Sequence, residues 1–177
     1  MTTMEALFSR KSVRTYTGEN ITDDELRQIL KAAYAAPVGM GDYASLRLTV
    51  VRNPALLEKI DRAAATLFGQ PETHPLYGAP TLIIVSTKLP EKGSGNLPYS
   101  NGAIVTQNMA IAATELGVGV CHIWGAMSAV RADPALMAEL KLPEGHVPCC
   151  SVCLGRTEEM YSLRDIPDGR IDTAFLD

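Results

Sequence analysis

One long apolar segment, residues 99–116, restricts the fold of this chain more than any other feature. Its length and composition predict a helix, and Gly117 directly after it is the residue type that most often ends one. An apolar stripe at helical spacing runs along it, formed by Val105, Met109, Ala112 and Leu116. The stripe can pack inside its own chain or against a second subunit, and the sequence leaves both arrangements open.

Local signals place shorter helices and strands around this segment. Thr22 and Glu25 form a capping box that starts a helix ending before Pro37. Two further helices are expected where a capping residue precedes a proline, at Asn53 and Asp133, and a short one over residues 3–8. Strands are expected over residues 46–51, 81–87, 118–123 and 147–154. Four strands between helices indicate a sandwich of the α+β or α/β class, and the pattern alone does not decide which strands are parallel.

Composition excludes several classes of protein. The 177 residues fit one domain, residues 1–177, and 46% hydrophobic with 20% charged residues are typical of a soluble globular protein. With 16 basic against 20 acidic residues and a single tryptophan, neither a nucleic-acid-binding face nor a base-stacking platform is evident. No apolar run approaches the roughly 20 residues that span a membrane, and no targeting signal is evident. We therefore expect a cytoplasmic protein with reduced cysteines and without nucleic-acid or membrane partners.

A cluster of positive charge stands near the amino terminus of this acidic chain, whose net charge is −4. Arg10, Lys11 and Arg14 fall within six residues, together with Ser9 and Ser12. Guanidinium and ammonium groups bind phosphate by charge-assisted hydrogen bonds, and serine hydroxyls add further donors. The cluster therefore indicates a site for a small anion, although a solvated basic patch has the same composition.

Three other segments also stand apart from the predicted scaffold. Residues 35–43 carry two glycines directly after a helix, where backbone amides can approach a flat ligand. Residues 117–125 form a strand that ends in Trp124 and Gly125, and the last segment runs from Arg156 to Arg170. The ordinary interpretations of the three are a helix stop, a buried strand end and a solvated turn.

Taken in order along the chain, these segments resemble the FMN-dependent nitroreductase family. The opening cluster resembles the Arg-x-Ser-x-Arg phosphate signature of that family. Similar segments follow in the family's order: Ala35-Ala36-Pro37 after the second helix, Tyr77-Gly78-Ala79-Pro80 before a core strand, residues 108–119 in the long dimer-forming helix and the strand behind it, and residues 147–155 in the final strand. The resemblance implies an α+β, three-layer sandwich with a mainly antiparallel central sheet flanked by helices, in an intertwined homodimer.

The resemblance also implies roles for individual residues. Arg10 and Ser12 would hold the FMN phosphate and ribityl chain beside Lys11, and Arg170 would reach the same phosphate. Arg14 would lie at N1 and O2 of the flavin ring, where a fixed cation stabilises the charge of the reduced ring. The backbone at the N5 and O4 edge would come from Trp124 and Gly125. The other subunit would pack on the ring with Pro37, Val38, Gly39 and Met40, and the residues expected to act in catalysis are Arg14, Trp124 and Gly125.

The implied activity is that of a flavin oxidoreductase. NADH or NADPH would give a hydride to the flavin and leave, and a nitroaromatic, a quinone or a similar electron-poor acceptor would then take the electrons, in a ping-pong mechanism. A non-redox flavin-binding or flavin-carrier protein would need the same cationic cradle and is the alternative. The substrate pocket is expected from residues 67–75 and 88–99.

Two segments depart from the family pattern. Gly41-Asp42-Tyr43 stands where the family usually has an asparagine and a Gln-Pro-Trp stretch, and Asp168 stands where a lysine is common. The chain is also short between Ile60 and Tyr77, which leaves little room for extra helices over the site. A more open pocket is the hypothesis that follows.

Three cysteines near the end of the chain invite a metal-site interpretation. Cys149, Cys150 and Cys153, with His146, have spacings that a zinc or iron–sulfur site can use. Because side chains alternate along a strand, we expect Cys149 and Cys153 on one face and Cys150 on the other. That separation favours a buried core, so we expect no bound metal, and a metal-binding regulatory domain is the remaining rival.

Overall fold

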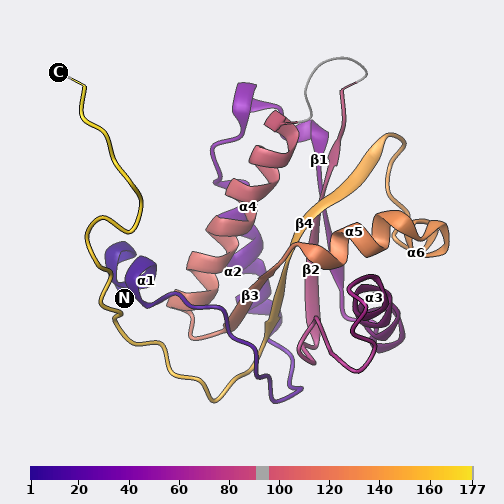
Figure 1. Cartoon of the computed structure of the whole chain (residues 1–177), viewed down its shortest axis with the longest axis horizontal. Coiled ribbons are helices and arrows are strands. Elements are labelled where there is room, and N and C mark those ends of the chain that lie inside the picture. Colours follow the sequence, from indigo (N-terminus) through magenta and orange to yellow (C-terminus); the bar gives the residue numbers. More distant parts are fainter. Residues whose placement is uncertain (91–95, 177) are drawn as a thin grey trace.

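The computed structural model describes residues 1–90 and 96–176 as a sheet between two layers of helices, with an extended arm on one side (Figure 1). The helices are α1 (Thr3–Ser9), α2 (Asp23–Tyr34), α3 (Pro54–Leu67), α4 (Asn96–Glu115), α5 (Gly125–Ala132) and α6 (Pro134–Glu139). The strands are β1 (Leu46–Val51), β2 (Thr81–Lys88), β3 (Gly119–Ile123) and β4 (His146–Gly155). Short 3-10 turns cover Gly39–Gly41 and Tyr43–Ser45. Among the described helices, none has the length and apolarity needed to cross a lipid bilayer.

The sheet has the strand order β1-β2-β4-β3, and each of its three strand pairs is antiparallel. This arrangement confirms the α+β class that the resemblance implies. The four strands lie where the sequence predicts them, within one residue at each end. The capping boxes of α1 and α2 also form: the Thr22 hydroxyl accepts from the Glu25 backbone N–H, and the Glu25 carboxylate accepts from the Thr22 backbone N–H.

The sequence does not predict α5. Its N-cap residue is Trp124, whose side chain makes no capping hydrogen bond, so the usual start signal is missing. The helix directly follows β3, and its buried residues Ala126, Met127 and Val130 pack against the sheet. Tertiary packing therefore fixes this helix, and its amino terminus stays open.

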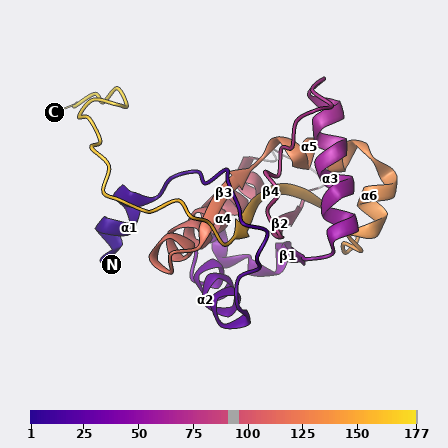
Figure 2. The same ribbon diagram turned by 90° about the horizontal axis from the view of Figure 1, so that it is seen from below.

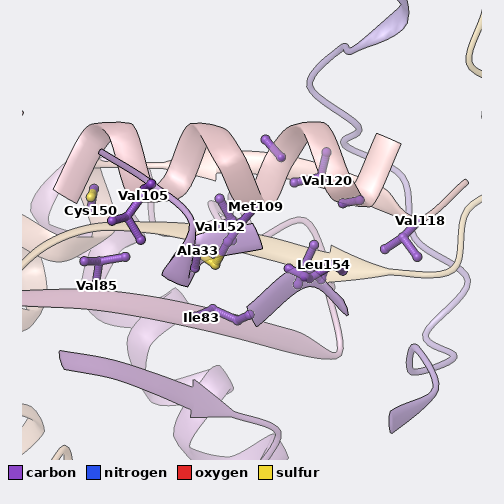
Figure 3. Close-up of a cluster of buried hydrophobic side chains, with 14 of the residues drawn as sticks. Ala33, Ile83, Val85, Val105, Met109, Val118, Val120, Cys150, Val152 and Leu154 are labelled. Atoms are coloured by element: carbon purple, nitrogen blue, oxygen red, sulfur yellow. The ribbon is translucent and has the colours of Figure 1, made fainter. Parts of the chain in front are cut away.

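Two buried clusters hold the layers together. On one face of the sheet, α2 and α4 cover Ile83, Val85, Val152 and Leu154 (Figure 3). On the other face, α3, α5 and α6 cover Leu82, Ile84 and Cys153. The predicted stripe on α4 belongs to the first cluster, because Val105 and Met109 are buried in it and Ala112 and Leu116 pack against it. The stripe therefore serves the core of its own chain.

A β-bulge in β4 corrects the predicted arrangement of the cysteines. Val85 pairs with Cys150 but Ser86 pairs with Pro148, so Cys149 is an extra residue in the ladder. A bulge interrupts the two-residue alternation of a strand. As a result Cys149 and Cys150 both face α4, with their Sγ atoms 3.6 Å apart, while Cys153 lies in the opposite cluster. The prediction that Cys149 and Cys153 share a face is wrong.

The arm consists of α1, residues 10–17 and the tail 156–176; residues 10–17 run along the sandwich, and α1 and the tail lie on one side of it (Figure 2). The tail is extended and runs beside α1, where the Arg164 backbone N–H and its Nε both donate to the Phe8 carbonyl, at 3.2 and 2.9 Å. Many large apolar side chains of the arm are exposed: Met1, Met4, Leu7, Phe8, Met160, Leu163, Ile171, Phe175 and Leu176. One chain alone does not bury this surface.

Candidate functional site

The cationic cluster lies along the free edge of the sheet. The Val13 backbone N–H donates to the Val120 carbonyl of β3 at 2.9 Å, so residues 10–14 run beside that strand. Burial raises the pKa of the Cys121 thiol, and Arg14, Ser12 and Arg10 lie close enough to oppose part of that rise. The structure thus brings Arg10, Ser12 and Arg14 together at β3.

Arg10 is the most isolated charge of this group. Its guanidinium is half-buried, and among residues 1–90 and 96–176 no hydrogen bond or ion pair reaches it. Burial lowers the pKa of Arg10, and the positive charge of Arg164 lowers it further. Two guanidinium groups are therefore held near each other without a carboxylate between them, which costs free energy unless an anion binds there.

Arg164 is the functional candidate that the sequence reasoning missed. It lies in the tail, and its guanidinium donates only to the carbonyls of Leu7 and Phe8 within the described residues. Arg170, which the resemblance placed at the phosphate, is exposed and makes no hydrogen bond or ion pair in the part of the chain that the structure describes. The two arginines are six positions apart in a tail without a helical or strand pattern, so no local signal distinguished them.

Two other polar side chains lie near the cluster: Glu159 beside Lys11, and His122 near Arg10. The Lys11 ammonium lies 2.9 Å from the Glu159 carboxylate, so its charge is already paired within the arm. On the other side, His122 is held by Gln107, with 3.2 Å between Nε2 and Oε1, and its buried Nδ1 has no partner in the described chain. Burial lowers the pKa of His122, and Arg10 lowers it further, so the imidazole is neutral at pH 7. Its Nδ1 is therefore a buried polar atom near Arg10 that the described chain leaves without a hydrogen bond.

Trp124 and Gly125 lie at the end of β3, where α5 begins. Trp124 is 57% exposed, which argues against the alternative that it is a core residue. The first amides of a helix have no intrahelical acceptor, so the backbone N–H groups at Gly125 and Ala126 are available to an external oxygen or nitrogen. A Cβ at position 125 would lie 2.3 Å from the Phe68 ring, which explains the glycine there. The predicted pocket segment 67–75 therefore reaches this place through Phe68.

Residues 37–40, which the resemblance places on the flavin ring of the other subunit, lie away from residues 10–14. Gly39 is fixed by its backbone N–H, which donates to Asn101 Oδ1 in the first turns of α4 at 2.9 Å. Met40 is 94% exposed, and with Gly39 it lines a cavity of about 380 Å³. Pro37 is exposed and Val38 buried, and no described hydrogen bond joins this segment to residues 10–14. Part of the other predicted pocket segment, residues 91–95 of 88–99, lies outside the described residues.

Comparisons with known proteins place this chain in a family. The sequence profile of the nitroreductase family matches residues 7–156. An Archaeoglobus fulgidus protein with the provisional name NADH dehydrogenase/NAD(P)H nitroreductase is 30% identical over 166 residues, covering 93% of this chain and 91% of that protein. A Methanothermobacter thermautotrophicus protein of the same name is 29% identical over 174 residues, 95% of this chain and 84% of its own length. The chain belongs to the nitroreductase family.

Solved structures agree with this assignment. A Bacteroides fragilis nitroreductase crystallised with bound FMN is 30% identical and superposes with a TM-score of 0.82, covering 99% of this chain and 100% of its own. A Desulfitobacterium hafniense nitroreductase, also with bound FMN, is 25% identical with the same TM-score and the same coverage. The three-layer α+β architecture is thus the fold of this family.

Proposed function

We propose that this chain is an FMN-dependent oxidoreductase that takes hydride from NADH or NADPH and reduces a nitroaromatic, a quinone or a similar electron-poor acceptor. The FMN bound in the two similar nitroreductase structures supports the cofactor, and the names of the two archaeal relatives support the electron donor. The observation that carries the proposal is the half-buried Arg10 guanidinium, which has no anionic partner among the described residues.

The donor set fits a mononucleotide. Arg10 and Arg164 supply two guanidinium groups that have no carboxylate partner among the described residues. Guanidinium binds a phosphate dianion by paired, charge-assisted hydrogen bonds. Ser12 lies beside them, and the unpartnered Nδ1 of His122 adds a polar group. Arg170 remains a predicted ligand, since a tail this exposed can reach a second subunit.

The chain's own residues give the bound group its position and its electrostatics. When bound, FMN supplies the hydride and electron-transfer chemistry of both half-reactions of a ping-pong cycle. Arg14 holds a permanent positive charge where the ring becomes electron-rich, because arginine does not lose its proton near neutral pH. The open amides at the start of α5 would donate to the other edge of the ring, and the exposed Trp124 would lie beside it. No acid–base pair of the protein is required.

A homodimer completes this arrangement. The exposed apolar side chains of the arm form a surface of the kind that a second subunit covers. Pro37, Val38, Gly39 and Met40 then pack on the flavin ring of the partner's site, which agrees with the exposure of Pro37 and Met40 in one chain. We also propose a cytoplasmic location, because all four cysteines are free thiols, as is usual in a reducing compartment.

The visible spectrum of the purified protein tests the proposal. We expect flavin absorption bands that NADH or NADPH bleaches without oxygen and that menadione restores, with steady turnover when both are present. A flavin that neither nicotinamide reduces would favour the non-redox carrier, and a protein that takes up no FMN would reject both functions. Zinc analysis of the same sample addresses the metal rival; among the described residues, no group of three or more His, Cys, Asp or Glu side chains is arranged to hold a metal ion.

A further inference from the structure

A strained turn lies beside the cationic cluster. Tyr77 has φ of +57°, followed by Gly78 at +71°, and only Met40 and Lys141 share this property among the other non-glycine residues that the structure describes. The left-handed region disfavours a bulky L-residue because Cβ approaches the following carbonyl oxygen. Backbone strain of this kind persists only where the surroundings hold it, and it gathers at functional sites.

A buried carboxylate holds the turn in this conformation. Asp61 of α3 is only 6% exposed; its Oδ1 accepts from the Leu76 backbone N–H at 2.7 Å, and its Oδ2 lies 2.8 Å from His74 Nδ1. The Tyr77 backbone N–H donates to the His74 carbonyl at 2.8 Å. Burying a carboxylate is costly unless hydrogen bonds compensate, and an apolar residue would fill the same space at lower cost. Asp61 therefore serves to hold His74 and Leu76, the residues that lead into Tyr77.

The side chain that the turn presents is in contact with Arg14. The Arg14 Cζ atom lies 5.7 Å from the centre of the Tyr77 ring, within the range of a cation–π interaction. The proximity of Tyr77 also raises the pKa of Arg14 above its usual value. Within the described chain no carboxylate forms an ion pair with this guanidinium, which also donates a 3.5 Å hydrogen bond to the Ser12 carbonyl. Tyr77 is thus the side chain that restrains Arg14.

We infer that Tyr77, held in place by Asp61, is a positioning residue that orients the Arg14 guanidinium toward the flavin ring. An exposed arginine has many rotamers, and fixing one of them before the ligand binds removes an entropic cost of binding. A carboxylate would fix the arginine as well, but it would also neutralise the charge that the reduced ring requires. An aromatic ring holds the cation and leaves its charge available. The inference rests on the proposed FMN-binding function.

The test compares substitutions at Tyr77 in the full-length protein, with FMN affinity and the reduction potential of bound FMN as readouts. Tyr77→Asn removes the ring while tolerating the left-handed backbone, and Tyr77→Phe keeps the ring. We expect Tyr77→Asn to raise the FMN dissociation constant about tenfold and to make the potential more negative. We expect Tyr77→Phe to stay within about threefold of the wild type.

A double-mutant cycle separates positioning from general stability. If Tyr77 acts through Arg14, then Tyr77→Asn has no further effect on affinity or potential once Arg14→Ala is present. Equal effects of Tyr77→Asn in both backgrounds would overturn the inference. So would a Tyr77→Phe protein that behaves like Tyr77→Asn.

Asp61 is tested with a matched control. Asp61→Asn replaces the acceptor facing His74 by an amide, and we expect the same direction of change as for Tyr77→Asn, at smaller size. Asp133→Asn is the control, because the Asp133 carboxylate likewise accepts from backbone N–H groups, those of Ala135 and Leu136, but at the start of α6. Equal potentials in the wild type and Asp61→Asn would remove Asp61 from the inference. A wild-type protein that binds no FMN rejects the proposed function itself, whereas unchanged Tyr77 variants of an FMN-binding protein reject only the role of Tyr77.

Discussion

The sandwich and the arm differ in how completely a single chain buries its apolar side chains and pairs its charged ones. In the sandwich, two apolar clusters fill both faces of the sheet, and residues such as Ile29, Ile60 and Met109 are fully buried. In the arm, Phe175 is 85% and Leu176 96% exposed, and Arg10 has no counter-ion among the described residues. The core of the sandwich is therefore complete within one chain, while the described part of the arm leaves apolar side chains exposed and Arg10 without an ion pair.

The largest expected effect tests the sandwich. Met109→Ala removes a fully buried side chain of α4 and leaves a cavity, so the free energy of unfolding should fall by about 3 kcal/mol. Urea unfolding measures this change. FMN affinity, corrected for the unfolded fraction, should stay within twofold; a specific loss of affinity would show that the two regions are not independent.

The second prediction tests the charge of the arm. Arg10→Ala should weaken FMN binding by about 2 kcal/mol, roughly 30-fold, because a charged hydrogen bond is lost. Fluorescence titration of FMN measures the affinity. Arg27→Ala is the control, since it removes the same charge from an exposed ion pair with Asp24 on α2 and should leave the affinity unchanged. Unchanged FMN affinity in Arg10→Ala would contradict the assigned role.

The third prediction tests the apolar surface of the arm. Phe175→Ser should raise the dissociation constant of the homodimer about tenfold, because part of an aromatic side chain no longer leaves water on association. Sedimentation at several protein concentrations measures this constant, and the far-ultraviolet circular dichroism should not change. A wild-type protein that sediments as a monomer would refute the dimer directly.

The smallest expected effect concerns the ion pair that connects the arm to the sandwich, between Arg156 and Glu25. Arg156, where the tail begins, forms paired hydrogen bonds of 2.8 Å with the Glu25 carboxylate at the start of α2. Burial alone would raise the pKa of Glu25, but hydrogen bonds from the Thr22 backbone and Arg156 outweigh it and hold the pKa below its usual 4.5. This stabilisation is therefore present above pH 4.5 and is lost as the pH falls below it. Glu25→Gln should cost less than about 1 kcal/mol at pH 7.

Thermal unfolding between pH 7 and pH 3 measures the effect. The stability of the wild type should fall more steeply below pH 4.5 than that of Glu25→Gln. Parallel curves would show that the ion pair between Arg156 and Glu25 contributes nothing to the stability of the fold.

The elements that the sequence predicted are those with local causes. The capping box at Thr22 and the caps at Asn53 and Asp133 each lie within three residues of the amides they satisfy, and all three helices begin where expected. The antiparallel class came from the family resemblance, since the pattern of strands alone left the direction of pairing open.

The features that the sequence did not reveal depend on distant contacts. The bulge at Cys149 arises from the register with β2, and a contact with α1 places Arg164 near Arg10. Asp61 gave no signal either, because its partners His74 and Leu76 lie 13 and 15 positions away on a turn without regular structure. For the site, the sequence predicted which residue types gather at β3, and the fold decides which of them are free to bind.

The contact between Phe68 and Gly125 has a practical consequence for redesign. A side chain at position 125 requires the exposed ring of Phe68 to move, because its first carbon would lie 2.3 Å from that ring. The effect of a substitution at position 125 should therefore depend on residue 68, and pairing a small residue at 68 with alanine at 125 removes the need for this movement. Evolution of substrate preference at this end of the strand is therefore expected to proceed through coupled changes.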